Sequence, residues 1–317
     1  MSKRYLGIDV GAESIKLVFL EENNNTLSIA SKESYEHGKN PQHVLQTLYQ
    51  KYGIEHFDAV AITGRFSKQF TATRIPVQQA QSRGFKHLYP NTTGTLISIG
   101  SHGFSVLELR ENGREIFREN SRCSQGTGNF LRQLVGRFSM SIEEASVVTA
   151  DISNAASLSG RCPVILKTDM THLANKGEHK VEILAGLFDA VCENVLNLVK
   201  PGISPNPVVL IGGVSQSKRI QQTCQKKLKA FGFDFIYDPE LAIYFEALGA
   251  ALIAKEDALK PPKFDNLLAS EEEHDLEKTP RLSSYMHQVK RMPAPLITTS
   301  KSGKVVIGLD IGSTGAK

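Results

Sequence analysis

One short motif with chemical potential occurs twice in the chain. Residues 7–16 read GIDVGAESIK and residues 308–317 read GLDIGSTGAK, so both contain Gly-hydrophobic-Asp-hydrophobic-Gly, four further residues and Lys. In the first copy, Asp9 at the end of a strand can hold a magnesium ion through water, and Lys16 can place positive charge beside a phosphate. Gly11 lets backbone N–H groups approach that phosphate. The motif predicts a phosphate-binding turn.

Three more glycine turns lie next to expected strands or helices: 100–103 (GSHG), 126–128 (GTG) and 212–213 (GG). Any one of them could simply end a strand, as glycines do in many α/β proteins. Four of them, with one motif duplicated, favour a nucleotide site, because a helix start adds N–H groups and a favourable dipole. The expected nucleotide-binding residues are Gly11, Ala12, Lys16, Gly100, Ser101, Gly126, Thr127, Gly128, Gly212 and Gly213.

Two of the four cysteines precede helical segments. Cys123 lies just before a helix near 128–138, and Cys162 is followed by Pro163, which suits the first turn of a helix. A helix start stabilises thiolates and any anionic cluster bound to them. A cubane iron–sulfur cluster usually takes four thiolates, so this pair would supply half at a two-fold interface. Spacing alone leaves open the alternative that both are ordinary small buried residues.

Strand and helix patterns alternate along the chain, which predicts an α/β fold. We expect strands at 4–10, 15–21, 25–33, 59–62, 95–99, 105–109 and 208–211. We expect helices at 42–52, 76–88, 128–138, 141–149, 163–175, 180–200 and 240–255. Cys192 and Cys224 fall inside helix patterns and are expected in the core.

The composition argues against a nucleic-acid-binding protein and against a membrane-spanning one. The 317 residues are 40% hydrophobic and 22% charged, which is ordinary for a globular protein of one large or two modest domains. The net charge of +4 is too small and too scattered to indicate nucleic-acid binding. No apolar run is long enough to cross a membrane, and the first residues lead directly into a strand without a secretory signal, so we expect a cytoplasmic protein.

The duplicated motif also predicts the domain organisation. Residues 1–255 form one domain, with subdomains of about 1–90 and 91–255. Residues 256–304 are polar, proline-bearing and aperiodic, which is typical of a linker. Residues 305–317 would then be the first strand and phosphate loop of a second, similar domain.

The order of these features resembles the actin, sugar-kinase and Hsp70 superfamily, in which two similar ribonuclease H-like subdomains enclose ATP. A more specific resemblance is to the BadF/BadG/BcrA/BcrD ATPase family, the activators of 2-hydroxyacyl-CoA dehydratases and benzoyl-CoA reductases. Its Cys-x-x-Gly-Thr-Gly-x-Phe motif is matched at 123–130, and its second cysteine at Cys162. The segments 159–169 and 245–251 look most like the long, fused members, which carry two activator domains in tandem.

This resemblance implies an actin-like fold that binds ATP or ADP with Mg²⁺, and a 4Fe–4S cluster shared between two domains through Cys123 and Cys162. It also implies ATP-driven transfer of an electron to a partner dehydratase or reductase. The two domains would belong to a homodimer or to a pseudo-dimer with the second copy.

Two departures from the family pattern concern the phosphate loops. The family's first loop is usually Gly-Ser-Thr, but this copy has Gly11-Ala12-Glu13, whose carboxylate either points to solvent or repels ATP from within. The acidic residues of the second loop are replaced by Ser98-Ile99-Gly100-Ser101-His102-Gly103. Asp9 and His102 are therefore the candidate catalytic residues, although His102 also fits a plain surface turn. Weak or absent hydrolysis in this half is expected.

Two alternative functions stay open from the sequence. One is a kinase-like or ATP-hydrolysing enzyme without a cluster, and the other is a non-catalytic pseudo-ATPase that serves as an interaction module. The altered loops argue against the first alternative.

Overall fold

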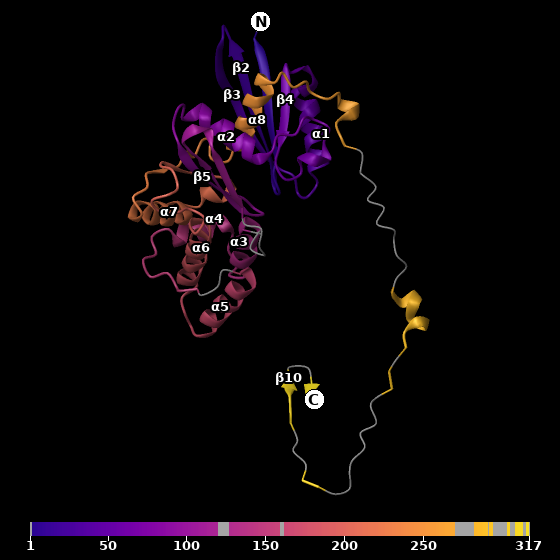
Figure 1. Cartoon of the computed structure of the whole chain (residues 1–317), viewed down its shortest axis with the longest axis vertical. Helices are drawn as coiled ribbons and strands as arrows, with labels where there is room; N and C mark the ends of the chain where they lie inside the picture. The colour runs from indigo at the N-terminus through magenta and orange to yellow at the C-terminus, as the bar shows by residue number, and fades with distance from the viewer. Residues whose placement is uncertain are drawn as a thin grey trace. The chain divides into compact units, whose positions relative to one another are not determined.

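The computed structural model describes residues 2–119, 127–158 and 162–269, together with short stretches of the C-terminal part at 282–290, 292–293, 303–304, 308–312 and 315–316. Contacts divide the chain into unit 1, Met1–Ser270, and unit 2, Glu271–Lys317. Unit 1 contains two sheets with their helices (Figure 1). In the part of the chain that is described, no helix has the length and apolar character needed to cross a membrane.

Lobe 1, as we name it, is built on a four-stranded sheet in the order β3-β2-β1-β4. Strands β1 (Lys3–Val10), β2 (Ser14–Asn23) and β3 (Thr26–Glu36) form an antiparallel meander, and β4 (Ala59–Thr63) pairs parallel to β1. Helix α1 (Pro41–Tyr52) contributes to the hydrophobic core on one face, and α8 (Phe245–Glu256) contributes to the core on the other.

Lobe 2 repeats this plan in a five-stranded sheet in the order β7-β6-β5-β8-β9. Strands β5 (Gly94–Ile99), β6 (Phe104–Leu109) and β7 (Glu115–Glu119) form the meander. Strand β8 (Val208–Ile211) pairs parallel to β5, and β9 (Phe235–Ile236) pairs parallel to β8. One face carries α3 (Thr127–Gly136), α4 (Ile142–Thr149), α5 (Pro163–Asn175), α6 (Lys180–Leu196) and α7 (Lys218–Ala230).

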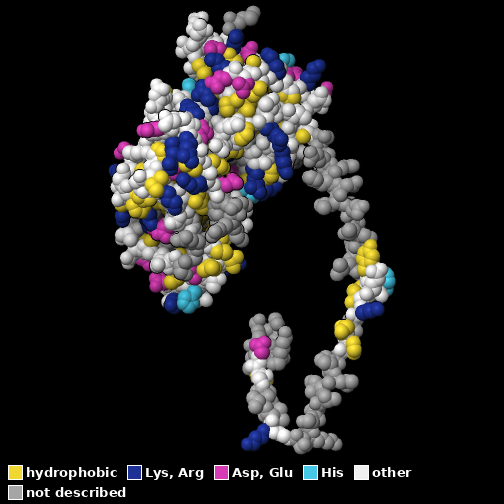
Figure 2. Space-filling model, in the orientation of Figure 1, with side chains coloured by type: hydrophobic (Ala, Val, Ile, Leu, Met, Phe, Trp, Pro, Cys, Tyr) yellow, Lys and Arg dark blue, Asp and Glu magenta, His cyan; other side chains and the backbone are white. Residues whose placement is uncertain are grey.

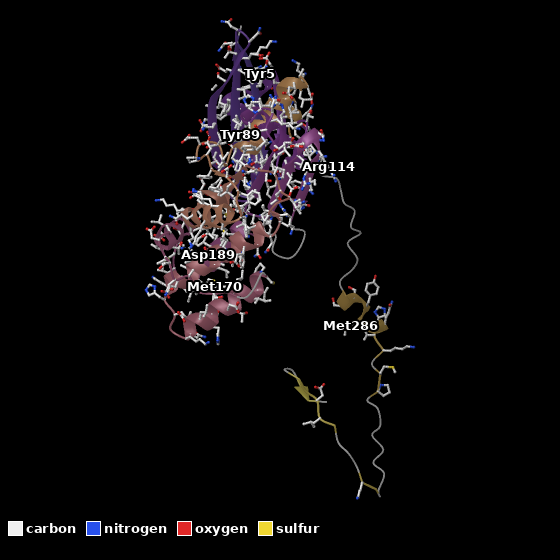
Figure 3. All side chains as sticks on the ribbon, turned by 60° about the vertical axis from the view of Figure 1, so that its left-hand side comes forward. Tyr5, Tyr89, Arg114, Met170, Asp189 and Met286 are labelled. Carbon is white, nitrogen blue, oxygen red and sulfur yellow. The ribbon has the colours of Figure 1, made fainter. Side chains whose placement is uncertain are left out.

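Helix α2 (Val77–Leu88) joins the lobes, because it packs against α8 and also contacts β6. Figure 3 shows Tyr89, next to the end of α2, between Tyr5 of lobe 1 and Asp189 of lobe 2. Each lobe combines an antiparallel meander with a parallel strand pair and covering helices, which confirms the predicted α/β fold class.

The structure confirms most expected elements and corrects several. The last long helix begins at Phe245 instead of 240, the helix expected to reach residue 200 ends at Leu196, and β7 was not expected. The helix pattern around Cys224, for which no bounds were predicted, is α7. Residues 257–269, assigned from composition to a linker, pack on lobe 1: Leu267 is buried, and Leu268 bridges Phe70.

Unit 2 contains the second copy of the motif. Its strands β10 (Ile311–Gly312) and β11 (Gly315–Ala316) form a hairpin in which Ile311 pairs with Ala316. The corresponding pair of the first copy is Val10 with Ile15. The two copies therefore share their hairpin register as well as their sequence frame.

Two glycines allow the backbones of α8, β1 and α2 to touch. A Cβ atom placed on Gly249 would lie 1.8 Å from the Ala80 carbonyl oxygen of α2, and one on Gly7 would lie 1.9 Å from the Ala247 carbonyl oxygen of α8. Any side chain at either position would have to displace backbone rather than a mobile side chain. These contacts fix α8 against both neighbours.

We expect Gly249→Ala to destabilise the protein by about 1–3 kcal/mol, because the added methyl group has no room between two helix backbones. Gly136→Ala is the matched control, since Gly136 also lies in a helix and a Cβ there would meet nothing within 4 Å. Urea unfolding followed by circular dichroism measures both variants. Equal stability of the two variants would contradict the described packing.

Candidate functional site

The first candidate site residues form an ion pair at the end of β1. Asp9 and Lys16 are register partners on β1 and β2, and the Lys16 Nζ donates to the Asp9 carboxylate at 2.9 Å. The Asp9 side chain is 4% exposed and that of Lys16 is 15% exposed. Burial opposes the charge on Lys16, but the Asp9 carboxylate prevails and raises its pKa. The Lys16 ammonium is thus held beside the Asp9 carboxylate.

The turn between these strands is tightly supported. Gly11 donates its N–H to the Ser14 carbonyl, and the neighbouring Ala12 is buried. His37 is buried behind the turn: its Nδ1 accepts from the Lys39 N–H, which leaves Nε2 to donate to the Gly11 carbonyl at 3.2 Å. Gly64, with φ of +95°, passes so close that a Cβ atom there would lie 2.2 Å from the Asp9 carboxylate.

The predicted turns of lobe 2 come together with the start of α3. Gly128 donates its N–H to the Gly100 carbonyl, and the next residue donates to the Ser101 carbonyl. A Cβ on Gly128 would lie 2.9 Å from the Ser101 Cα and 3.0 Å from Val214. The turn Gly212–Gly213 is therefore part of the same arrangement, and Gly213 faces open space.

The two lobes meet at these turns. The Ser101 Oγ donates to the Glu13 carboxylate across the lobes at 3.4 Å. His102 lies beside them, and its buried Nδ1 atom makes no hydrogen bond to any described residue. Burial, followed by the charges of Arg65 and Lys39, lowers the pKa of His102, so its ring is neutral at physiological pH. A neutral imidazole can hydrogen-bond a phosphate or a water without repelling a cation.

Sequence reasoning missed a further ionisable group in this site. Glu246, in the first turn of α8, accepts hydrogen bonds from Gln81 at 2.7 Å and Ser98 at 3.2 Å. Burial, followed by repulsion from the Asp9 carboxylate, raises the pKa of Glu246. The available signal was a single carboxylate in an otherwise apolar helix start, FEALGAAL.

Helix α8 thus places the Glu246 carboxyl group beside Ser98, which stands where the family's second loop has an acidic residue. The site combines the Asp9–Lys16 pair with a more readily protonated acid.

The predicted cluster ligands are only partly described. Cys123 and Gly126 lie outside the described residues. Cys162 is the N-cap of α5, is half-buried, and makes no capping hydrogen bond with its side chain. Within the described ranges, no three His, Cys, Asp or Glu side chains gather in a way that could hold a metal ion.

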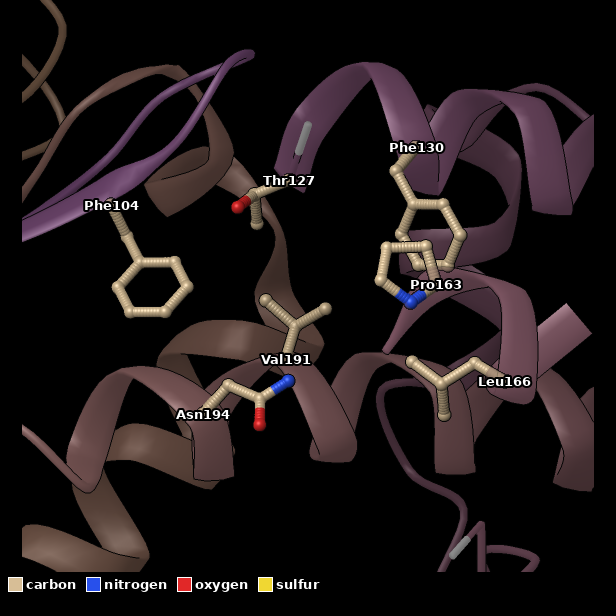
Figure 4. A pocket seen from close by; sticks show the side chains of 7 residues that line it. All are labelled: Phe104, Thr127, Phe130, Pro163, Leu166, Val191 and Asn194. Carbon is tan, nitrogen blue, oxygen red and sulfur yellow. The ribbon is translucent and has the colours of Figure 1, made fainter. Parts of the chain in front are cut away.

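The starts of α3 and α5 share one small cavity. Its lining includes Thr127 at the start of α3, Pro163 directly after Cys162, and Phe130 and Leu166 one turn further along the two helices (Figure 4). The remaining two cysteines, Cys192 and Cys224, are fully buried with their sulfur atoms 3.4 Å apart, which confirms their place in the core.

A family model described as the BadF/BadG/BcrA/BcrD ATPase family matches residues 6–254. The chain belongs to this family. The (R)-2-hydroxyglutaryl-CoA dehydratase activating ATPase of Acidaminococcus fermentans is 26% identical over 265 residues, covering 82% of this chain and all of that protein. The activator of lactoyl-CoA dehydratase of Anaerotignum propionicum is 26% identical over 261 residues, covering 80% of this chain and 98% of the relative.

A solved structure of a dehydratase activator agrees in fold. The activator of the 2-hydroxyisocaproyl-CoA dehydratase from Clostridium difficile, with bound ADPNP, superposes with a TM-score of 0.68 at 25% identity. The match covers 93% of this chain and all of the activator. The actin-like ATPase fold expected from the sequence is therefore confirmed.

The raised pKa of Glu246 makes a prediction about stability. The folded state holds its proton more tightly than the unfolded chain, so this contribution is present below about pH 4.5 and is lost as pH rises through the raised pKa. We expect chelator-treated Glu246→Gln to be more stable than the unmodified protein at pH 7, with the difference shrinking towards pH 4.5. Thermal unfolding across this range measures it.

Glu143→Gln is the control, because Glu143 is an exposed carboxylate in the first turn of α4. A pH-independent difference between Glu246→Gln and the unmodified protein would contradict the assigned direction.

Proposed function

We propose that this chain is an ATP-dependent iron–sulfur activator that passes electrons to a 2-hydroxyacyl-CoA dehydratase or to a benzoyl-CoA reductase type of enzyme. The observation that carries the nucleotide part is the meeting of glycine turns from both lobes beside the Asp9–Lys16 pair. Family membership and the dehydratase activators matched over nearly their whole lengths support the partner class.

In this proposal the first turn and the second turn receive the phosphates of ATP or ADP. Lys16 would place its charge against a phosphate oxygen, and Asp9 would hold the waters of a Mg²⁺ ion, which favours sites of one or two carboxylates plus phosphates. The neutral His102, whose buried Nδ1 atom has no hydrogen-bond partner in the described part of the chain, is suited to bind a phosphate or orient a water.

Cys123 and Cys162 would hold one side of a 4Fe–4S cluster, which supplies one-electron transfer when it is bound. The half-buried Cys162 thiol at the start of α5 fits a thiolate ligand, since the helix start favours its negative charge. The helices that follow the two cysteines in the sequence, α3 and α5, share a cavity at their starts, which supports this assignment.

The surface next to Cys162 is suited to face a second activator domain. Val164 and Ile165 are 67% and 49% exposed, although both are large apolar residues. Figure 2 shows hydrophobic side chains on the surface at the α5 end of unit 1. Covering such a patch with another copy, or with the second domain of a fused protein, would give the cluster its four thiolates.

We further propose that this half hydrolyses ATP slowly. Ser98 and Gly103 stand at positions where the family's second loop is acidic, and the carboxyl group beside Ser98, that of Glu246, is shifted towards its neutral form. A neutral carboxyl group is a poor base for an attacking water.

Anaerobic reconstitution tests the cluster. We expect about two irons and two sulfides per chain, in a species of dimer mass, for one cubane shared by two chains. Cys162→Ser should lose most of this iron, because the remaining thiolate cannot hold the cluster alone. Iron, acid-labile sulfide and molar mass are measured on the same sample.

Cys192→Ala serves as the control, since its thiol is fully buried in the core and lies against the Cys224 sulfur. It should retain the iron of the unmodified protein. Unchanged iron in a folded Cys162→Ser variant would count against the cluster assignment.

A further inference from the structure

Glu13, which replaces a hydroxyl residue in the first phosphate turn, points into the junction of the lobes. Its carboxylate accepts from the Lys39 Nζ at 2.5 Å, from the Arg132 Nη1 at 3.2 Å and from the Ser101 Oγ at 3.4 Å. Its side chain is 21% exposed, so the solvent-facing alternative for Glu13 is wrong.

These partners come from both lobes. Lys39 precedes α1 in lobe 1, whereas Ser101 lies in the turn after β5 and Arg132 lies on α3 in lobe 2. A single carboxylate thus spans the junction with two charge-assisted hydrogen bonds and one to a hydroxyl group. Without it, Lys39 and Arg132 would bring like charges together across the lobes.

The surroundings of Glu13 are those of an anion site. The cationic Lys39 and Arg65 act on His102, whose Nδ1 lacks a partner among the described residues. Partial burial opposes ionisation of Glu13, but Lys39 and Arg132 prevail and hold its pKa below the ordinary value. At physiological pH the chain therefore supplies its own anion at this place.

We propose that Glu13 is a built-in anion that clasps the two lobes together in the absence of nucleotide and competes with the terminal phosphate of ATP for the same cations. The clasp rests on the contacts above, and the competition rests on the proposed nucleotide site. In this arrangement the Glu13 carboxylate occupies the place that a phosphate of the ligand would take in the first loop.

Global stability is a poor probe of this clasp, because Lys39 and Arg132 are 63% and 55% exposed. Exposed ion pairs contribute little to unfolding free energy. Local opening of the junction and competition with ATP are the quantities that Glu13 controls.

Hydrogen exchange of the full chain tests the clasp. Glu13→Gln keeps the size of the side chain and removes its charge, so amides in 11–14 and 100–103 should exchange at least about threefold faster, a shift of ~0.7 kcal/mol in local opening. Glu36→Gln is the matched control: Glu36 is exposed on β3 and pairs with Ser14 in register, next to the same turn. It should leave this exchange unchanged.

Titration calorimetry with ATP and Mg²⁺ tests the competition. Glu13→Gln should bind ATP on the order of tenfold more tightly than the unmodified chain, because a close like charge is removed. Arg132→Gln separates the two roles: it should speed exchange as Glu13→Gln does, but should not tighten ATP binding.

Exchange that is unchanged in Glu13→Gln would overturn the clasp, and ATP binding that is unchanged or weaker would overturn the competition while leaving the proposed nucleotide site intact. Faster exchange with no ATP binding by any of these proteins would support the clasp and count against the nucleotide part of the proposed function.

Discussion

The close contact of α8 with β1 and α2 is the constraint from which the rest of unit 1 follows. Gly7 and Gly249 let three backbones meet where side chains would normally keep them apart. Because α8 begins beside the end of β5, this packing also sets the position of Glu246 relative to Ser98 and Asp9. A steric requirement between a strand and two helices therefore determines the electrostatics of the candidate site.

That site is organised by how its charges are balanced. Lys16 neutralises Asp9, and proton binding is favoured at Glu246, so little uncompensated charge is buried beside β1. At the junction of the lobes, by contrast, the Glu13 carboxylate balances the charges of Lys39 from lobe 1 and Arg132 from lobe 2. The charges of Asp9, Lys16 and Glu246 are balanced among buried neighbours. The balance around Glu13 depends on the two lobes remaining in contact.

Much of this fold could be predicted from the sequence, because hydrophobic periodicity reports locally on buried faces. The helix at 163–175 and the strand at 208–211 were placed at their observed bounds for this reason. The bounds of helix α7 around Cys224 could not be predicted because its buried residues are few, although Ile220, Cys224 and Leu228 have the spacing of one helix face. The late start of α8 depends on a distant contact, since Gly212 donates its N–H to the Ala242 carbonyl and holds that segment as a turn.

For the candidate site, the residue types in the glycine turns predicted nucleotide binding, but they did not show which way each side chain points. The sequence could not tell whether Glu13 faces solvent, because its partners Ser101 and Arg132 are distant in the chain.

The position of α8 in the chain also has a consequence for biosynthesis. The core of lobe 1 joins residues of β1 and β2 to residues 247–254, whereas lobe 2 is continuous between them. During translation, the strands and helices of lobe 2 from β5 to β9 all emerge before α8, whereas the first strands made must wait for this last helix to complete their core.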